Sequence, residues 1–129
     1  MASKDTRPLS PHLQIYKLPL TALLSISHRI TGVINSVGAL FLVLVLARAA
    51  GGEESFGFAS ALLSSWFGYL VLFGFTLALY FHFCNGIRHL LWDAGIGLEL
   101  DTAERSARFA LIAAGVLTVM TWIIAIAAG

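Results

Sequence analysis

Residues 30–47 read ITGVINSVGALFLVLVLA, eighteen consecutive positions without Asp, Glu, Lys, Arg or His. Two further stretches resemble it. Residues 55–87 contain no Asp, Glu, Lys or Arg and a single histidine, and residues 109–129 contain no ionisable side chain. An α-helix needs about 20 mostly apolar residues to cross the hydrocarbon core of a bilayer. The pattern therefore predicts three transmembrane helices, at about residues 23–48, 62–87 and 107–128.

The composition agrees with a membrane protein. Of the 129 residues, 58% are hydrophobic and 12% are charged, and the mean hydropathy is +0.85; soluble domains carry about 25% charged residues. A net charge of +1 argues against nucleic acid as a partner. The single cysteine, Cys84, excludes an internal disulfide. We expect an all-α integral membrane protein, with a short cytoplasmic N-terminal arm (residues 1–22) and a three-helix transmembrane domain in the lipid bilayer (residues 23–129).

Lysine and arginine predict the orientation of the spans. Of the eight such residues, only Arg48 lies between the first and second spans. The other seven flank the first span at its N-terminal side or lie near the connection between the second and third. Because positive charges favour the cytoplasmic side, we expect a cytoplasmic N-terminus and a C-terminus outside. No Arg-rich, Ser-rich transit segment precedes the first span, so we expect a bacterial inner (cytoplasmic) membrane.

Polar residues recur at spacings of four, three and four on one face of each of the first two spans. The first stripe consists of Ser25, Arg29, Gly32 and Ser36, with His28 beside it. The second stripe consists of His82, Gly86, His89 and Asp93. Residues at these spacings share one face of a helix. Ionisable groups inside a membrane are costly and point to a functional site.

The two stripes suit a haem in the cytoplasmic half of the bilayer. His82 lies six residues before Arg88, about 9 Å deeper at about 1.5 Å per residue. Its imidazole would bind the iron, and the nearby glycine Gly86 would let the flat macrocycle approach the helix. Arg29 and His28, closer to the surface, would meet the propionates.

The second axial ligand is open at this point. His82 and His89 lie about 10 Å apart along the helix, whereas trans ligands of one iron lie roughly 4 Å apart. His28 or a histidine of a partner chain remains. A structural interpretation competes with the haem: His82 would be a hydrogen-bonding strut between helices, and Arg29 and Arg88 would extend to the interface. For Arg88 we favour that interpretation.

Three segments together resemble a known family. Residues 7–16 (RPLSPHLQIY), 25–32 (SISHRITG) and 82–93 (HFCNGIRHLLWD) are similar to the cytochrome b subunit of succinate dehydrogenase, part of the membrane anchor of respiratory complex II. The combination of Ser-x-x-His-Arg-x-x-Gly with His-x-x-x-Gly-x-Arg-His-x-x-x-Asp is specific. The resemblance runs from residue 7 to about residue 95.

The resemblance implies a haem b held between this chain and a second small transmembrane subunit, each giving one axial histidine. His82 matches that ligand, and His89 matches a histidine near the haem that does not bind iron. His28 and Arg29 match groups near the propionates. Ser25 and Arg29 match residues at the quinone pocket, and the quinone is ubiquinone or menaquinone. The N-terminal arm would dock against the iron–sulfur subunit.

We therefore expect a membrane-anchor and electron-transfer subunit. The chain has no flavin-binding fold and no iron–sulfur cysteines, so dicarboxylate chemistry would belong to a flavoprotein subunit and an iron–sulfur subunit. Catalysis would then be a property of the complex and not of this chain alone. The alternatives are a haem-free membrane scaffold or transporter subunit, and the anchor of a fumarate reductase working in the opposite direction.

Overall fold

A computed structural model describes residues 16–129, together with Thr6 and Pro8. The predicted N-terminal arm and its docking face lie for the most part outside the described residues. The described chain forms α1 (Leu20–Ala50), α2 (Glu53–Leu63), α3 (Trp66–Asp93) and α4 (Leu100–Ala128). Three of these, α1, α3 and α4, are long and apolar enough to cross a membrane. The prediction of an all-α protein with three spans is confirmed.

The bounds of the helices differ from those predicted. Helix α1 begins three residues earlier than expected, and α3 begins four residues later and extends to Asp93. The late start of α3 has a local cause, because the side chain of Ser65 accepts a hydrogen bond from Gly68 N at 3.1 Å and caps the helix. Most of the residues between the first and second predicted spans form the separate helix α2, which begins after Gly52, a glycine with φ of 94°.

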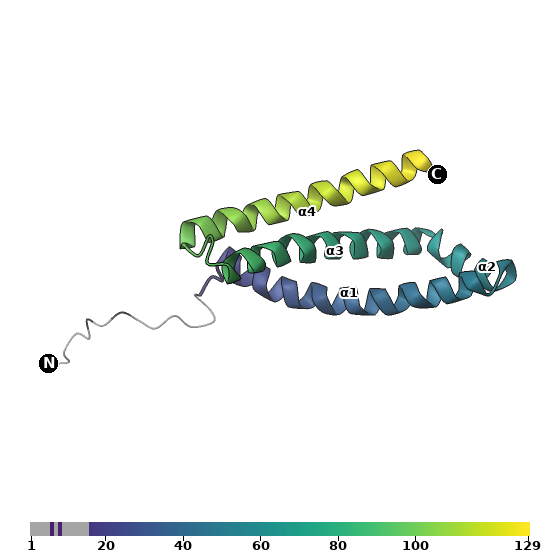
Figure 1. The fold of residues 1–129 in the computed structure, drawn as a ribbon, viewed down its shortest axis with the longest axis horizontal. Helices are drawn as coiled ribbons and strands as arrows, with labels where there is room; N and C mark the ends of the chain where they lie inside the picture. Colours follow the sequence, from purple (N-terminus) through teal and green to yellow (C-terminus); the bar gives the residue numbers. More distant parts are fainter. Residues whose placement is uncertain (1–5, 7, 9–15) are drawn as a thin grey trace.

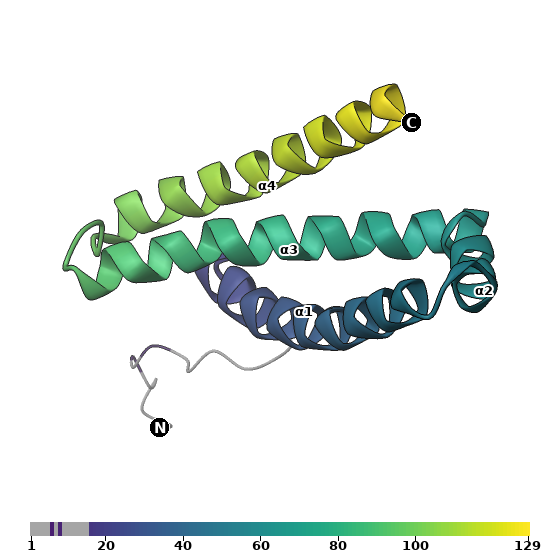
Figure 2. The same cartoon turned by 45° about the vertical axis from the view of Figure 1, so that its right-hand side comes forward.

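Helix α3 lies between α1 and α4, as the two views in Figures 1 and 2 show. The N-terminal end of α1, the C-terminal end of α3 and the N-terminal end of α4 meet at one end of the bundle, while α2 joins α1 to α3 at the other. The predicted polar stripes therefore lie at the same end of the bundle. We call this end, which contains the loop Ala94–Glu99, the loop end.

Small residues let α3 and α4 approach closely. The buried side of α4 is a seam of four alanines and a threonine: Ala103, Ala107, Ala110, Ala114 and Thr118. Transmembrane helices associate through such small side chains, because lipid supplies no hydrophobic driving force between helices. Further from the loop end, Tyr80 at the middle of α3 shares a hydrogen bond of 2.7 Å with Thr121 of α4, between their hydroxyl oxygens.

Helices α1 and α3 are held close at a glycine. A Cβ atom placed on Gly38 would lie 1.8 Å from the ring of Phe75, so no larger residue fits without a shift. The outer face of α1 is apolar and exposed, with Val33, Leu40 and Val43 each more than 60% exposed. Such a face suits lipid tails or another apolar helix.

We expect Gly38→Ala to destabilise the protein, because the new methyl group forces the ring of Phe75 to move. Overpacking of this kind costs about 1–3 kcal/mol. The measurement is the melting temperature of the purified complex in detergent. Gly74→Ala is the matched control, since nothing lies within 4 Å of the added Cβ atom. Equal melting temperatures for the two variants would contradict the close approach of α1 and α3.

Candidate functional site

His82 is oriented by groups on α1. Its Nδ1 atom lies 3.0 Å from the backbone oxygen of His28 and 3.1 Å from Oγ1 of Thr31. A carbonyl oxygen only accepts hydrogen bonds, so the contact with His28 is a hydrogen bond in the tautomer that carries the proton on Nδ1. In that tautomer the lone pair is on Nε2, which hydrogen-bonds to no other described residue. A histidine that binds a metal through one nitrogen usually donates its other N–H to such an acceptor.

The three histidines of the two stripes lie side by side. The rings of His28 and His82 stack with their centroids 3.9 Å apart and their planes 4° from parallel. The ring of His89 also contacts the ring of His28, with the centroids 5.1 Å apart and the planes tilted by 43°. We call these three residues the histidine row. The row joins α1 to α3 at the loop end of the bundle.

The stacking bears on the second axial ligand. Two trans ligands direct nitrogen atoms at an iron ion that lies between them, roughly 4 Å from nitrogen to nitrogen. Rings stacked face to face at 3.9 Å leave no space for that ion. In this arrangement the rings of His28 and His82 cannot bind one iron ion together.

The surroundings of the histidine row fit a flat group with acidic substituents. A Cβ atom at Gly32 would lie 3.1 Å from Cε1 of His82, and one at Gly86 would lie 3.8 Å from Cε1 of His28. The glycines thus let the rings and backbones approach. Nδ1 of His28 is buried without a hydrogen-bond partner among the described residues, so it can serve a propionate. No cluster of three or more His, Cys, Asp or Glu side chains suited to a bare metal ion occurs in residues 16–129.

Ser25 and Arg29 lie one turn apart on α1, on either side of His28 in sequence. Ser25 is half-buried, whereas Arg29 is exposed. Spacing of four residues turns both side chains to the same face. The structure therefore leaves a hydroxyl and a guanidinium available on one face at the loop end, close along the helix to the histidine row.

The position of Arg88 contradicts the sequence interpretation that its side chain extends to the membrane interface. The residue is buried, with 5% of its surface exposed. Its guanidinium donates to Oγ of Ser106 and to the backbone oxygen of Ala103, each at 3.0 Å, and also to Oδ1 of Asn85. The signal that sequence reasoning missed is Asn85, a second polar residue three positions earlier on the same face of the span.

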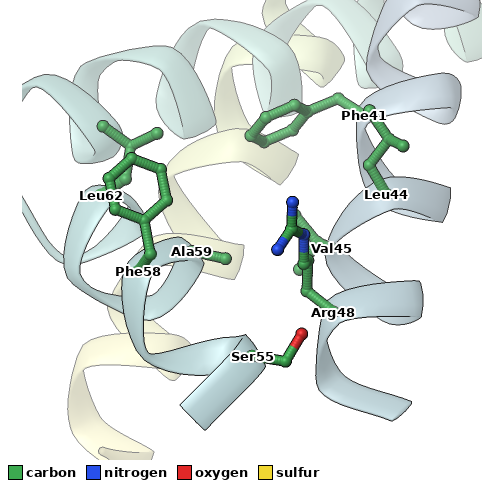
Figure 3. A pocket seen from close by; sticks show the side chains of 8 residues that line it. All are labelled: Phe41, Leu44, Val45, Arg48, Ser55, Phe58, Ala59 and Leu62. Carbon is green, nitrogen blue, oxygen red and sulfur yellow. The ribbon is translucent and has the colours of Figure 1, made fainter. Parts of the chain in front are cut away.

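A hollow of about 150 Å³ lies at the other end of α1. Figure 3 shows the guanidinium of Arg48 directed into it, between Phe41 of α1 and Phe58 of α2. Its lining is almost entirely apolar. Leu44, which lines the hollow, lies sixteen positions after His28 on α1, and this corresponds to about 24 Å along the helix. The hollow is therefore separate from the histidine row.

Comparisons with known proteins identify the family. Residues 3–122 match the family model described as succinate dehydrogenase/fumarate reductase transmembrane subunit. The chain belongs to this family. It is 40% identical over 122 residues to the succinate dehydrogenase cytochrome b556 subunit of Paracoccus denitrificans, covering 95% of this chain and 94% of the relative. It is 38% identical to the cytochrome b560 subunit of Reclinomonas americana, covering 92% of this chain and 85% of that one.

A third relative points to the same family. The chain is 40% identical to the succinate dehydrogenase cytochrome b560 subunit of Marchantia polymorpha, over 91% of this chain and 89% of the relative. The resemblance drawn from the three sequence segments is therefore confirmed. The chain is a cytochrome b-type membrane subunit of succinate dehydrogenase, a multi-pass membrane protein that works within an enzyme complex.

Proposed function

We propose that this subunit holds a haem b together with a partner subunit and helps to form the site where quinone is reduced. The observation that carries the proposal is the hydrogen bond from Nδ1 of His82 to the backbone oxygen of His28. It fixes the ring and leaves Nε2 as the metal-binding atom. The cytochrome b names of the relatives support the same assignment.

His82 would bind the iron through Nε2, and a histidine of a second small transmembrane subunit would bind from the opposite side. The bound haem supplies a centre that accepts and releases one electron. His28 and Arg29 would neutralise the propionates, with His89 close by. The unpartnered Nδ1 of His28 is suited to donate a hydrogen bond to a carboxylate.

Ser25 and Arg29 would bind the headgroup of a ubiquinone or menaquinone. The hydroxyl of Ser25 is placed to hydrogen-bond a quinone carbonyl oxygen. The exposed guanidinium of Arg29 stabilises the negative charge that develops on that oxygen during reduction.

The assembly would place succinate chemistry outside the membrane domain. A flavoprotein subunit would oxidise succinate, and an iron–sulfur subunit would pass the electrons to the cytoplasmic side of the anchor. This requires the loop end to face the cytoplasm of a bacterium, in agreement with the lysines and arginines gathered near that end. The N-terminus is then cytoplasmic and the C-terminus outside.

The test is a reduced-minus-oxidised optical spectrum of the purified complex, recorded with succinate and with dithionite as the reductant. We expect a b-type band with both reductants, because electrons from succinate reach the anchor. Succinate without the soluble subunits should give no band. A complex that lacks the band under dithionite would leave the subunit a haem-free anchor.

A further inference from the structure

Arg88 carries a charge inside the bundle that the proposed haem and quinone sites do not use. We propose that Arg88 is a positioning residue that fixes the histidine row, and through it the ring plane of His82. This inference rests on the proposed function, since His82 is taken as the haem ligand. It concerns how the ring is held and not whether it binds.

The guanidinium donates three hydrogen bonds, two of which join α3 to α4. Nε donates to Oγ of Ser106, and one terminal nitrogen donates to the backbone oxygen of Ala103, both on α4. The other terminal nitrogen donates to Oδ1 of Asn85 on α3 itself. No carboxylate among the described residues pairs with it; the ion pairs in residues 16–129 lie on the exposed side of α4. A cation inside a membrane protein persists only where such partners hold it.

Trp92 connects this network to the histidines. The Cζ atom of Arg88 lies 4.6 Å from the centroid of the Trp92 ring, a cation–π contact. The same ring meets His89 nearly edge-on, with centroids 5.1 Å apart and planes at 80°. The indole is fixed on its far side, because Nε1 donates to the backbone oxygen of Gly97 at 3.2 Å.

A continuous set of contacts therefore runs from α4 to the proposed iron ligand. It passes from Arg88 through Trp92 to His89, and the histidine row continues it to His28 and His82. Each contact is one of ring against ring or charge against ring, so each fixes an orientation as well as a distance. Loss of the guanidinium removes one of the two contacts that hold Trp92 against His89 and leaves only the hydrogen bond to Gly97.

Two other roles for Arg88 predict different results. A purely electrostatic role would be kept by lysine, which carries the same charge. A positioning role would be lost with lysine, because its compact ammonium group cannot match a planar fork that donates in three directions. A role confined to joining α3 and α4 would change stability and leave the ring of His82 unmoved.

The experiment measures the electron paramagnetic resonance spectrum of the oxidised haem in the purified complex. The largest g value of a low-spin iron with two histidine ligands depends on the angle between the ligand ring planes. We expect Arg88→Leu and Arg88→Lys to shift this g value alike, with one haem per complex retained. Ser106→Ala, which removes one of the three bonds, should give a smaller shift. Arg108→Leu is the control, an exposed arginine paired with Glu104 at 2.6 Å, and should give the parent spectrum.

Trp92→Leu removes the ring that connects Arg88 to His89 and leaves the hydrogen bonds of the guanidinium in place. It decides the matter if Arg88→Leu fails to assemble. An unchanged g value in Trp92→Leu, or in Arg88→Lys with the shift confined to Arg88→Leu, would overturn the proposal. Its failure is distinguishable from failure of the proposed function. In the first case the parent complex contains haem and the variants keep its spectrum; in the second the parent complex contains none.

Discussion

The variant His82→Leu is expected to assemble without haem. Leucine has no nitrogen to bind iron, and it also removes the hydrogen bond by which Nδ1 connects α3 to the backbone of α1. The loss should be complete, because a haem held by one axial histidine from a partner has lost one of its two bonds to protein. Haem content per complex, measured as the pyridine haemochrome, and subunit content on a denaturing gel give the result.

His89→Leu is the matched control for that variant. It removes a histidine from the same helix and the same histidine row, seven positions away, and the bond to iron stays intact. We expect the haem to be retained. Full haem content in His82→Leu would rule out His82 as the ligand, and equal loss in both variants would show that the row supports assembly instead.

Ser25→Ala and Arg29→Leu are expected to lower electron transfer from succinate to quinone and to leave reduction of a soluble dye by the same complex intact. A lost hydrogen bond is worth about 0.5–1.5 kcal/mol, and about 1.5–3 when one partner is charged. These energies correspond to a decrease of roughly two- to tenfold for Ser25→Ala and at least about tenfold for Arg29→Leu. The ratio of the two activities in one membrane preparation is the measurement.

Ser36→Ala is the control for the quinone variants. Ser36 belongs to the same stripe of α1, but it lies deeper in the span, and its hydroxyl donates to the backbone oxygen of Gly32 at 2.9 Å. We expect its quinone and dye activities to match the parent. A fall of both activities together in Ser25→Ala would point to a defect of assembly, and a fall of neither would make the stripe structural. The haem spectrum of Ser25→Ala should remain that of the parent.

The spans could be predicted from sequence, and the candidate site residues could be proposed from it, because both depend on local pattern. Runs free of charge identify the membrane helices, and helical spacing gathers Ser25 with Arg29 and His82 with His89. What the pattern does not contain is the rotation of one helix against another. That rotation places His28 on the face of the His82 ring at 3.9 Å, an arrangement that only the packing of α1 on α3 decides.

Arg88 illustrates the same limit from the other direction. A lone arginine near the end of an apolar stretch is usually one that extends to the interface, and in its own helix only Asn85, three positions earlier, argues against this. Its other two acceptors are Ser106 and the carbonyl of Ala103, fifteen and more residues away on α4. A buried charge whose partners lie on another helix cannot be found by periodicity within its own helix.

The seam of small residues on α4 has a consequence for how this helix can diverge. Positions 103, 107, 110, 114 and 118 are buried within the bundle, whereas the opposite side exposes Phe109, Ile112 and Ile126. Substitutions that only exchange one apolar residue for another are therefore tolerated unequally around the helix. Mutational tolerance along α4 should rise and fall with the helical repeat, although from residue 109 onward no ionisable side chain distinguishes one side of the helix from the other.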